Sequence, residues 1–131
     1  MKRCYQCKTT KALDSFGSHA NRKDGKQTHC KDCMKEHQTR WYYKRKFGIT
    51  IDERDKMLED QDGKCAICQN PTEFTPVGSG RVNRTTYYAV VDHCHSSGEI
   101  RGILCGGCNT GLGSFKDNPT SLTSAVKYLT K

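Results

Sequence analysis

The chain has 131 residues, of which 34% are hydrophobic and 8% aromatic, so one small domain or two metal-stabilised modules fit better than a large apolar core. No apolar run is long enough to span a membrane, and no apolar signal segment follows the basic first residues, so we expect a cytoplasmic protein without a membrane partner. The formal net charge of +8 indicates a polyanionic partner.

Most of this positive charge lies in the first part of the chain. Residues 1–48 hold thirteen Lys or Arg against four Asp or Glu, whereas residues 49–131 hold nine against ten. A concentrated basic stretch is the electrostatic footprint of nucleic-acid binding. We therefore predict two domains, a basic zinc-binding module over residues 1–48 that grips DNA and a second domain over residues 49–131.

Eight of the nine cysteines form four C-x-x-C pairs, which are Cys4/Cys7, Cys30/Cys33, Cys65/Cys68 and Cys105/Cys108. In a reducing compartment this pattern favours two four-cysteine sites for structural Zn²⁺. A disulfide framework is the alternative, and it would require an oxidising compartment. Because Zn²⁺ with four thiolates carries −2, two such sites would lower the net charge from +8 to about +4. Cys94 is left without a pair.

The segment that holds the first two pairs contains few apolar residues. Residues 1–33 have the spacing of a zinc ribbon, and Asp24-Gly25 marks a turn within it. Leu13 and Phe16 are the sizeable apolar residues between the pairs. Bound metal must therefore supply most of the stability of this module.

A basic helix is predicted after the ribbon, from about Asp32 to Phe47, with Gly48 as its C-terminal stop. Its cations could form no more than a solvated helix face. Tyr42 and Tyr43 beside them favour a nucleic-acid interface instead. The DNA-binding residues predicted on this helix are Arg40, Lys44, Arg45 and Lys46.

A second helix is predicted to begin at Thr50, which is spaced from Glu53 as in a capping box, and to close at Gly63. Between residues 52 and 62 it carries six acidic and two basic side chains. This helix should therefore contact DNA poorly and instead pack beside the basic helix or face solvent.

A loop and a hairpin follow the third cysteine pair. Residues 69–84 contain prolines and glycines typical of a loop. A strand is predicted from Thr85 to Asp92 and a second strand over residues 100–104, joined by a turn over residues 96–99.

Two helices complete the chain. A short helix is predicted from about Asn109, and a last helix begins at Pro119. The apolar residues Leu122, Val126 and Leu129 share one side of the last helix, and we expect them to pack on the core.

The hairpin and the last cysteine pair bring together residues with oxygen and imidazole side chains. The chain doubles back, so Asp92 and His93 at the end of one strand should lie close to Asn109 at the helix N-terminus. Cysteine sulfur suits Zn²⁺, whereas carboxylate and amide oxygens suit Mg²⁺ or Mn²⁺. A lone histidine is more often an ordinary surface residue, but one beside such an oxygen pair can act as a general base near neutral pH.

The segments "CAIC", "VDHCHSSGEIRGILCGGCN" and "LGSFKDNP" resemble the recombination endonuclease VII family of phage nucleases, within the wider HNH, or His-Me finger, ββα-metal group. The resemblance covers roughly residues 47–129. It implies a small α+β, zinc-stabilised protein in which a ββα-metal nuclease core follows a zinc ribbon and two helices. The N-terminal ribbon resembles zinc-binding extensions that accompany such nucleases.

The resemblance also implies a role for each matching residue. The cysteines of the last two pairs bind structural Zn²⁺, Asp92 and Asn109 hold the catalytic Mg²⁺ or Mn²⁺, and His93 is the general base. His95 stands where the family has a second histidine near the phosphate. Cys94 stands where the family commonly has an acidic residue. Outside the basic helix, the predicted DNA-binding residues are Arg81, Arg84 and Arg101.

The predicted function is a phage DNA endonuclease of low sequence specificity that nicks or cuts duplex DNA inside a bacterial host. One alternative is a resolvase of branched DNA, such as a Holliday junction. The other is a non-catalytic double-zinc regulator that binds DNA or RNA, which would leave the oxygen pair beside His93 without a purpose. Because we expect the last helix to be committed to the core, the prediction is a monomer or at most a weak dimer.

Overall fold

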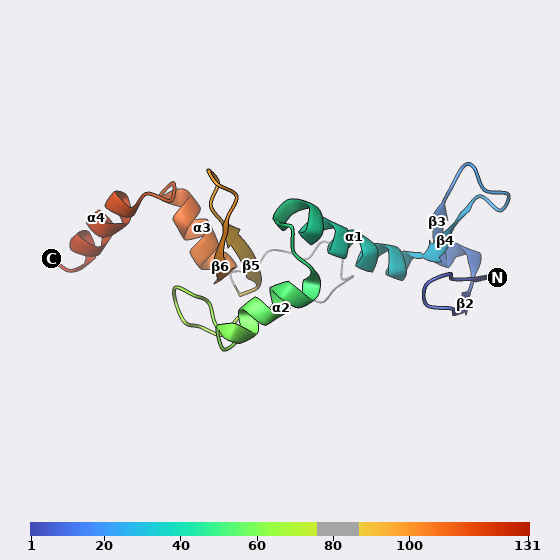
Figure 1. The fold of residues 1–131 in the computed structure, drawn as a ribbon, viewed down its shortest axis with the longest axis horizontal. Coiled ribbons are helices and arrows are strands. Elements are labelled where there is room, and N and C mark those ends of the chain that lie inside the picture. Colours follow the sequence, from blue (N-terminus) through green and yellow to red (C-terminus); the bar gives the residue numbers. More distant parts are fainter. Residues whose placement is uncertain (76–86) are drawn as a thin grey trace. The chain divides into compact units, whose positions relative to one another are not determined.

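The computed structural model describes residues 1–75 and 87–131 (Figure 1). The chain divides into two compact units. The first contains Met1–Ile51, and the second contains Asp52–Thr75 together with the described residues from 87 onward. Arg81, Arg84 and the predicted strand start at Thr85 lie outside the described residues.

The first unit is built from short strands around a cysteine cluster. Strand β1 (Lys2–Arg3) pairs with β2 (Thr10–Lys11), and β3 (Phe16–Ser18) pairs with β4 (Lys26–Cys30), with the 3₁₀ turn η1 (Leu13–Ser15) between the two hairpins. Both strand pairs are antiparallel. Phe16 is buried with three cysteines of this unit. Phe16 and its sulfur neighbours thus form the interior between the short strands.

Helix α1 (Lys31–Phe47) follows β4 directly, and the prediction of this helix is confirmed. Asp32 in its first turn and Lys44, Arg45 and Lys46 in its last turn complement the helix dipole. Gly48 ends the helix in a left-handed conformation, with φ of 72°, and its backbone N–H donates to the carbonyl of Lys44 at 3.0 Å.

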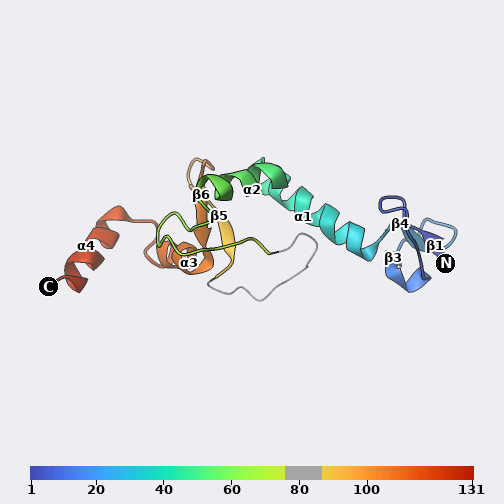
Figure 2. The same ribbon diagram turned by 90° about the horizontal axis from the view of Figure 1, so that it is seen from below.

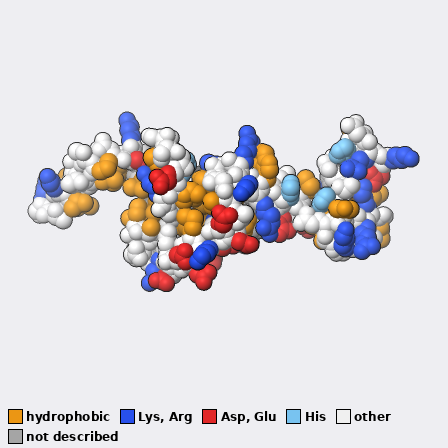
Figure 3. All heavy atoms as spheres, in the orientation of Figure 1, with side chains coloured by type: hydrophobic (Ala, Val, Ile, Leu, Met, Phe, Trp, Pro, Cys, Tyr) orange, Lys and Arg blue, Asp and Glu red, His pale blue; other side chains and the backbone are white. Residues whose placement is uncertain are grey.

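Helix α2 (Ile51–Asp60) is the acidic helix, and acidic side chains gather over it on the face shown in Figure 3. The backbone N–H of Gly63, at φ of 69°, donates to the carbonyl of Leu58 at 2.9 Å and closes the helix. Glycine adopts this left-handed conformation without strain. The prediction that Gly63 closes the helix is therefore confirmed.

The second unit has the strand–strand–helix arrangement that the family resemblance implies. Strand β5 (Ala89–His93) and strand β6 (Ile100–Cys105) form an antiparallel hairpin, and α3 (Gly106–Ser114) packs against both strands (Figure 2). The predicted small α+β fold, with a ribbon and two helices before a ββα core, is therefore confirmed.

Two predicted boundaries of this unit were wrong. Within the described residues, β5 begins at Ala89 and not earlier, because Tyr88 pairs with Glu73 instead of with β6. Helix α3 begins at Gly106 and not near Asn109. The sulfur of Cys105 accepts the backbone N–H of Cys108 at 3.4 Å and so caps the helix earlier than its sequence suggests.

Helix α4 (Pro119–Leu129) begins at the predicted proline. The side chain of Asn118 caps it and accepts the backbone N–H groups of Thr120 at 2.9 Å and Ser121 at 3.3 Å. The predicted packing of its apolar side was wrong, because Val126 is 60% exposed and Leu129 is 79% exposed. No helix in the described part of the chain is long and apolar enough to cross a membrane.

Candidate active site and metal centres

The eight paired cysteines come together in two groups of four, as their spacing predicts. Within each group the sulfur atoms all lie within 4.8 Å of one another. The first group joins Cys4 and Cys7 with Cys30 and Cys33, and the second joins the remaining two pairs. Four converging thiols are the donor set that Zn²⁺ prefers, and this chemistry fits both groups. Cys94 lies outside both.

In the first group, hydrogen bonds lower the pKa of Cys4 and Cys30, whereas burial raises the pKa of Cys33 to about 12. Burial alone raises the pKa of Cys4, but backbone N–H groups, that of Cys30 foremost, outweigh burial and lower the pKa to about 5. The ammonium of Lys11 also donates to the sulfur of Cys30 at 3.3 Å, which raises the pKa of Lys11. These donors supply positive potential around ligands that must lose their protons before a metal can bind.

The second group connects the hairpin to α3. Cys65 and Cys105 are buried together with Leu104, and Leu112 of α3 packs against them. Burial raises the pKa of Cys65, yet backbone N–H groups, that of Cys105 foremost, lower it to about 6. The second cysteine group therefore joins the start of α3 to the end of β6.

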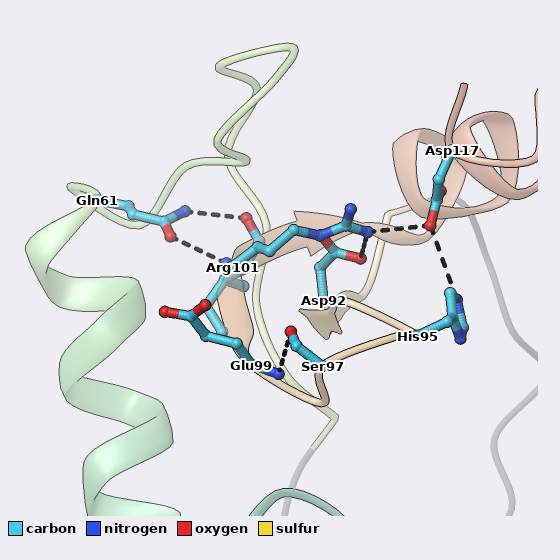
Figure 4. A network of polar contacts seen from close by, with 8 residues as sticks. Gln61, Asp92, His95, Ser97, Glu99, Arg101 and Asp117 are labelled. Carbon is cyan, nitrogen blue, oxygen red and sulfur yellow. Dashed lines mark hydrogen bonds and ion pairs between the residues drawn. The ribbon is translucent and has the colours of Figure 1, made fainter. Parts of the chain in front are cut away.

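Asp92 lies near the end of β5 and carries a buried carboxylate. It stands opposite Gly102 in the hairpin, and an irregularity of the register follows between Asp92 and His93. Arg101 of β6 binds both carboxylate oxygens, through Nε at 2.7 Å and through a terminal nitrogen at 3.0 Å. Figure 4 shows this pairing beside the end of the strand. The contact raises the pKa of Arg101 further.

The same guanidinium reaches a second carboxylate. Its terminal nitrogen donates to Asp117 at 3.3 Å, and the Nε2 atom of His95 lies 3.9 Å from the same oxygen of Asp117 (Figure 4). The rings of His93 and His95 have centroids 4.8 Å apart. We call Asp92, Arg101, Asp117 and His95 the Asp92 network. Its last three members line an open pocket together with Cys94, Ser96, Gly113 and Lys116.

Asn109 lies in the first turn of α3 and is half-buried. Because α3 packs against β5 and β6, the helix start and the Asp92 strand belong to one packed substructure. Together, Asp92 and Asn109 offer carboxylate and amide oxygens and no thiolate. This donor chemistry fits Mg²⁺ or Mn²⁺ and differs from that of the cysteine groups.

The predicted DNA-binding residues of α1 are exposed, and two of them contact aromatic rings. The guanidinium of Arg45 lies 4.9 Å from the ring centroid of Trp41, and the ammonium of Lys46 lies 5.4 Å from that of Tyr42. Trp41 is itself 54% exposed. An exposed row of cations and aromatic faces can contact phosphates and stack with bases.

Two residues of this region were missed from the sequence. Asp117 is the only acidic residue between residues 100 and 131, a signal that could have marked it. Gln61 exchanges two hydrogen bonds of 2.9 Å with the backbone of Ile103 on β6. No feature of the sequence indicates that Gln61 contacts Ile103, because forty-two positions separate the two residues.

Cys94, between the two histidines, carries an acidic thiol. Hydrogen bonds from the side chain of Ser97, and then from the backbone N–H groups of Ser97 and Ser96, lower its pKa to about 7. The backbone of the turn is closed by the N–H of Gly98, which donates to the carbonyl of Cys94 at 2.7 Å. The residue in the place of the family's acidic side chain is thus partly anionic near neutral pH.

Comparisons with known proteins agree with this geometry. A family model described as recombination endonuclease VII matches residues 39–131. The Gene 59 protein of Mycobacterium phage D29 is 37% identical over 86 residues, which cover 65% of this chain and 46% of that protein. For the Gene 59 protein of Mycobacterium phage L5 the identity is also 37%, over 84 residues, with coverages of 63% and 44%. The chain thus spans about half the length of these relatives.

One solved structure, that of the ββα-Me type II restriction endonuclease Hpy99I, is similar to the chain at 28% identity. The match covers 97% of this chain and 63% of that protein, with a TM-score of 0.38. The fold assignment rests instead on the strand–strand–helix arrangement and the two cysteine groups described above.

Proposed function

Because the chain belongs to the recombination endonuclease VII family, we propose that it is a divalent-metal-dependent DNA endonuclease of the HNH type that hydrolyses phosphodiester bonds. The observation that carries the proposal is the buried carboxylate of Asp92, next to His93 at the end of a hairpin that packs against α3. A carboxylate and an imidazole in consecutive positions suit a metal-dependent hydrolase better than a nucleic-acid-binding module without activity.

Three residues carry the chemistry in this proposal. Asp92 and Asn109 would hold Mg²⁺ or Mn²⁺, which supplies a Lewis acid for the charge that develops on the phosphate. His93 accepts the proton of the attacking water, a task suited to an imidazole near neutral pH. His95, at the wall of the pocket, would contact the phosphate. Zn²⁺ in the two cysteine groups would be structural.

The distribution of charge assigns DNA binding and DNA cleavage to different parts of the chain. Residues 1–48 would grip DNA through α1, and residues 49–131 would cut it. Phosphate contacts position a protein but carry no sequence information, so an enzyme that relies on them cuts with little sequence preference. The phage relatives support a phage-encoded enzyme that acts inside a bacterial host.

The test is incubation of the zinc-loaded protein with supercoiled plasmid, with and without Mg²⁺ or Mn²⁺. We expect open-circular DNA, followed by linear DNA, only when the divalent ion is present. A protein that retards the plasmid in a gel without cutting it under any of these conditions would be a regulator, and the endonuclease proposal would be wrong.

A second candidate, resolution of branched DNA, is favoured by one observation. Resolution requires two active sites at once, and therefore a dimer. We expected the apolar side of α4 to be buried, but Val126 and Leu129 are exposed and could contribute to an interface between two copies. Light scattering measures the mass in solution, and a labelled four-way junction reveals whether paired, symmetric cuts occur. A monomer or weak dimer that nicks duplex DNA remains our first prediction, because the exposed side of α1 is mostly cationic and like charges on two copies repel.

A further inference from the structure

Arg101 occupies a position between two carboxylates that do not touch each other. It binds Asp92 through two hydrogen bonds of 2.7 Å and 3.0 Å, and Asp117 through one of 3.3 Å (Figure 4). The side chain of Asp92 is 10% exposed, whereas that of Arg101 is 39% exposed. The guanidinium therefore covers the buried carboxylate on the side that faces the pocket.

This arrangement conflicts with metal binding at Asp92. A carboxylate has lone pairs for more than one partner, but a guanidinium that grips both oxygens places its positive charge beside any cation that binds there. Two cations a few ångströms apart in a partly buried site repel each other strongly. For a divalent ion to bind well, Arg101 must loosen its contact with Asp92.

Asp117 is placed to receive Arg101 when that happens. It lies in the turn after α3 at φ of 53°, and its backbone N–H donates to the carbonyl of Leu112 at 2.9 Å. This bond fixes its carboxylate at the wall of the pocket, within reach of both Arg101 and His95. An arginine that moved from Asp92 to Asp117 would keep an anionic partner and stay in the pocket beside Lys116.

We propose that Arg101 is a displaceable cation that neutralises Asp92 until the divalent ion binds, and that Asp117 is the positioning residue that then holds Arg101 at the pocket, where it faces the DNA phosphate. The inference rests on the proposed function in taking Asp92 as the ligand of that ion. It assigns Asp117 a role and gives Arg101 two alternating partners. Arg101 thus becomes part of the ion site rather than only a DNA contact.

The competing explanation is a structural ion pair in which Arg101 supports Asp92. The two explanations predict opposite changes in the affinity for the divalent ion when Arg101 is removed. If Arg101 competes with the ion, its removal strengthens ion binding. If Arg101 merely holds Asp92 in place, its removal weakens ion binding or leaves it unchanged. Measuring Mn²⁺ affinity directly separates these outcomes without any reference to DNA cleavage.

The experiment titrates the zinc-loaded full chain with Mn²⁺ and follows the electron paramagnetic resonance signal of the free ion. Arg101→Met should bind Mn²⁺ about tenfold more tightly than the wild type, which corresponds to about 1.4 kcal/mol. Asp117→Asn should bind it several-fold more weakly, because Arg101 then has Asp92 as its remaining carboxylate partner. In the Arg101→Met background, Asp117→Asn should change the affinity little, because the residue acts through Arg101.

Matched controls keep the result specific. Lys127→Met removes the same charge from an exposed position on α4, outside the Asp92 network, and should leave Mn²⁺ affinity unchanged. Asp92→Asn should abolish the tight site and so identify it. Unchanged zinc content and melting temperature show that each variant is folded.

The outcomes distinguish this inference from the proposed function. A wild type that binds Mn²⁺ at Asp92 and shows the predicted order of affinities supports the inference even if it cuts no DNA. Equal or weaker Mn²⁺ binding by Arg101→Met overturns it even if the wild type cuts DNA. An Asp117→Asn effect that persists in the Arg101→Met background also overturns it, as does the absence of Mn²⁺ binding by the wild type and all variants.

Discussion

At the scale of single residues, the chemistry of this molecule depends on which charges stand beside the Asp92 carboxylate. Arg101 binds both oxygens of that buried group, and the charge-assisted hydrogen bonds compensate for the hydration that burial removes. His93 follows directly, and the register irregularity after Asp92 turns the chain there. Asp92 and His93 thus occupy consecutive positions at the end of one strand.

The first prediction concerns His93 as the general base. His93→Ala should lower DNA cleavage by roughly 10²–10⁴-fold, the usual contribution of general-base catalysis, while DNA affinity stays nearly unchanged. Plasmid nicking rates and gel-shift titrations measure the two quantities. His37→Ala, on the exposed surface of α1, is the matched control. Near-normal nicking by the His93 variant would remove this residue from the mechanism.

The second prediction concerns the thiol of Cys94. A pKa of about 7 leaves roughly half of the thiol as thiolate at pH 7, whereas an unperturbed thiol is almost fully protonated there. Ser97→Ala removes the first of the hydrogen bonds that lower this pKa, so the pKa should rise. Alkylation of Cys94 by iodoacetamide in the zinc-loaded protein should then slow at pH 7 but not above pH 9.

Mass spectrometry of the Cys94 peptide gives both rates. Equal rates for the wild type and the variant at pH 7 would show that Ser97 does not stabilise the thiolate. The eight metal-site cysteines, protected by Zn²⁺, serve as internal controls, since their labelling reports loss of metal.

The residues that could be predicted are those whose role follows from residue type and spacing along the chain. The paired cysteines, and the sequence Asp-His followed by Asn109 after a turn, indicate two kinds of metal ligand. Arg101 was predicted only as a DNA contact. Its contacts with Asp92 and Asp117 depend on the hairpin register and on a turn after α3, neither of which the residue types alone determine.

At the scale of secondary-structure elements, the β5–β6 hairpin is supported from outside by the side chain of Gln61 and by the backbone N–H of Ala66, which donates to the carbonyl of Ile103 at 3.1 Å. Gln61, just after α2, accepts the backbone N–H of Ile103 and donates to its carbonyl, both at 2.9 Å. It also donates to the carbonyl of Lys64 at 2.9 Å. The glutamine amide therefore bonds to the edge of β6 in the way that a neighbouring strand would. Its partner Ile103 directly follows Gly102, which stands opposite Asp92.

The third prediction is that Gln61→Ala destabilises the protein by about 1–3 kcal/mol, because it leaves the backbone N–H of the buried Ile103 without its partner. Urea unfolding followed by circular dichroism measures the change. Gln38→Ala on the exposed surface of α1 should have an effect within about 0.5 kcal/mol. Equal stability of the two variants would show that solvent replaces the Gln61 amide.

Elements with their own start and stop signals were predicted well, and elements that depend on distant partners were not. Helix α1 carries its dipole charges and its terminal Gly48 in its own sequence. The start of α3 was misplaced because a cysteine, and not one of the usual polar residues, caps it. The apolar side of α4 was assigned to the core because its spacing does not reveal whether a partner surface exists.

At the scale of the whole molecule, charge and chemistry belong to different parts of the chain. The cations and exposed aromatic rings of α1 lie in the first unit, and the Asp92 network lies in the second. Acidic α2 follows directly in the chain. The expected consequence is that mutations can weaken DNA binding without touching the chemistry.

The fourth prediction tests this separation. A variant in which glutamine replaces the four predicted DNA-binding residues of α1, Arg40, Lys44, Arg45 and Lys46, should bind duplex DNA more weakly. The salt dependence should become shallower by about 0.9 in slope for each phosphate that the variant no longer neutralises. Fluorescence anisotropy at several salt concentrations measures both quantities, and Mn²⁺ affinity should stay unchanged.

The control neutralises four lysines of the second unit, Lys56, Lys64, Lys127 and Lys131, and so produces the same net charge. It should keep most of the slope of the wild type. Equal slopes for the two variants would mean that only the total charge matters and that α1 is not the interface.

The fifth prediction is a content of two zinc ions per chain by elemental analysis. Cys94→Ser should retain both, because Cys94 lies outside the two cysteine groups. Cys65→Ser should lose one ion and unfold the second unit, since a structural zinc site contributes roughly 10–16 kcal/mol in small zinc-finger peptides. A single zinc per wild-type chain, or zinc loss on changing Cys94, would contradict this assignment.

Cys105 has a part in three features of the fold. It ends β6 opposite Ala89, supplies a thiol to the second metal group and caps α3. Asp92 lies on the strand that this residue pairs with, and Asn109 lies on the helix that it starts. If Zn²⁺ fills the second cysteine group and Mn²⁺ binds at Asp92, as proposed, we expect the two metals to load in order, with Zn²⁺ first. A chain made under zinc starvation should bind no Mn²⁺ at Asp92 and should become competent when zinc is restored, so the zinc supply of the cell would set when a newly made chain can first act on DNA.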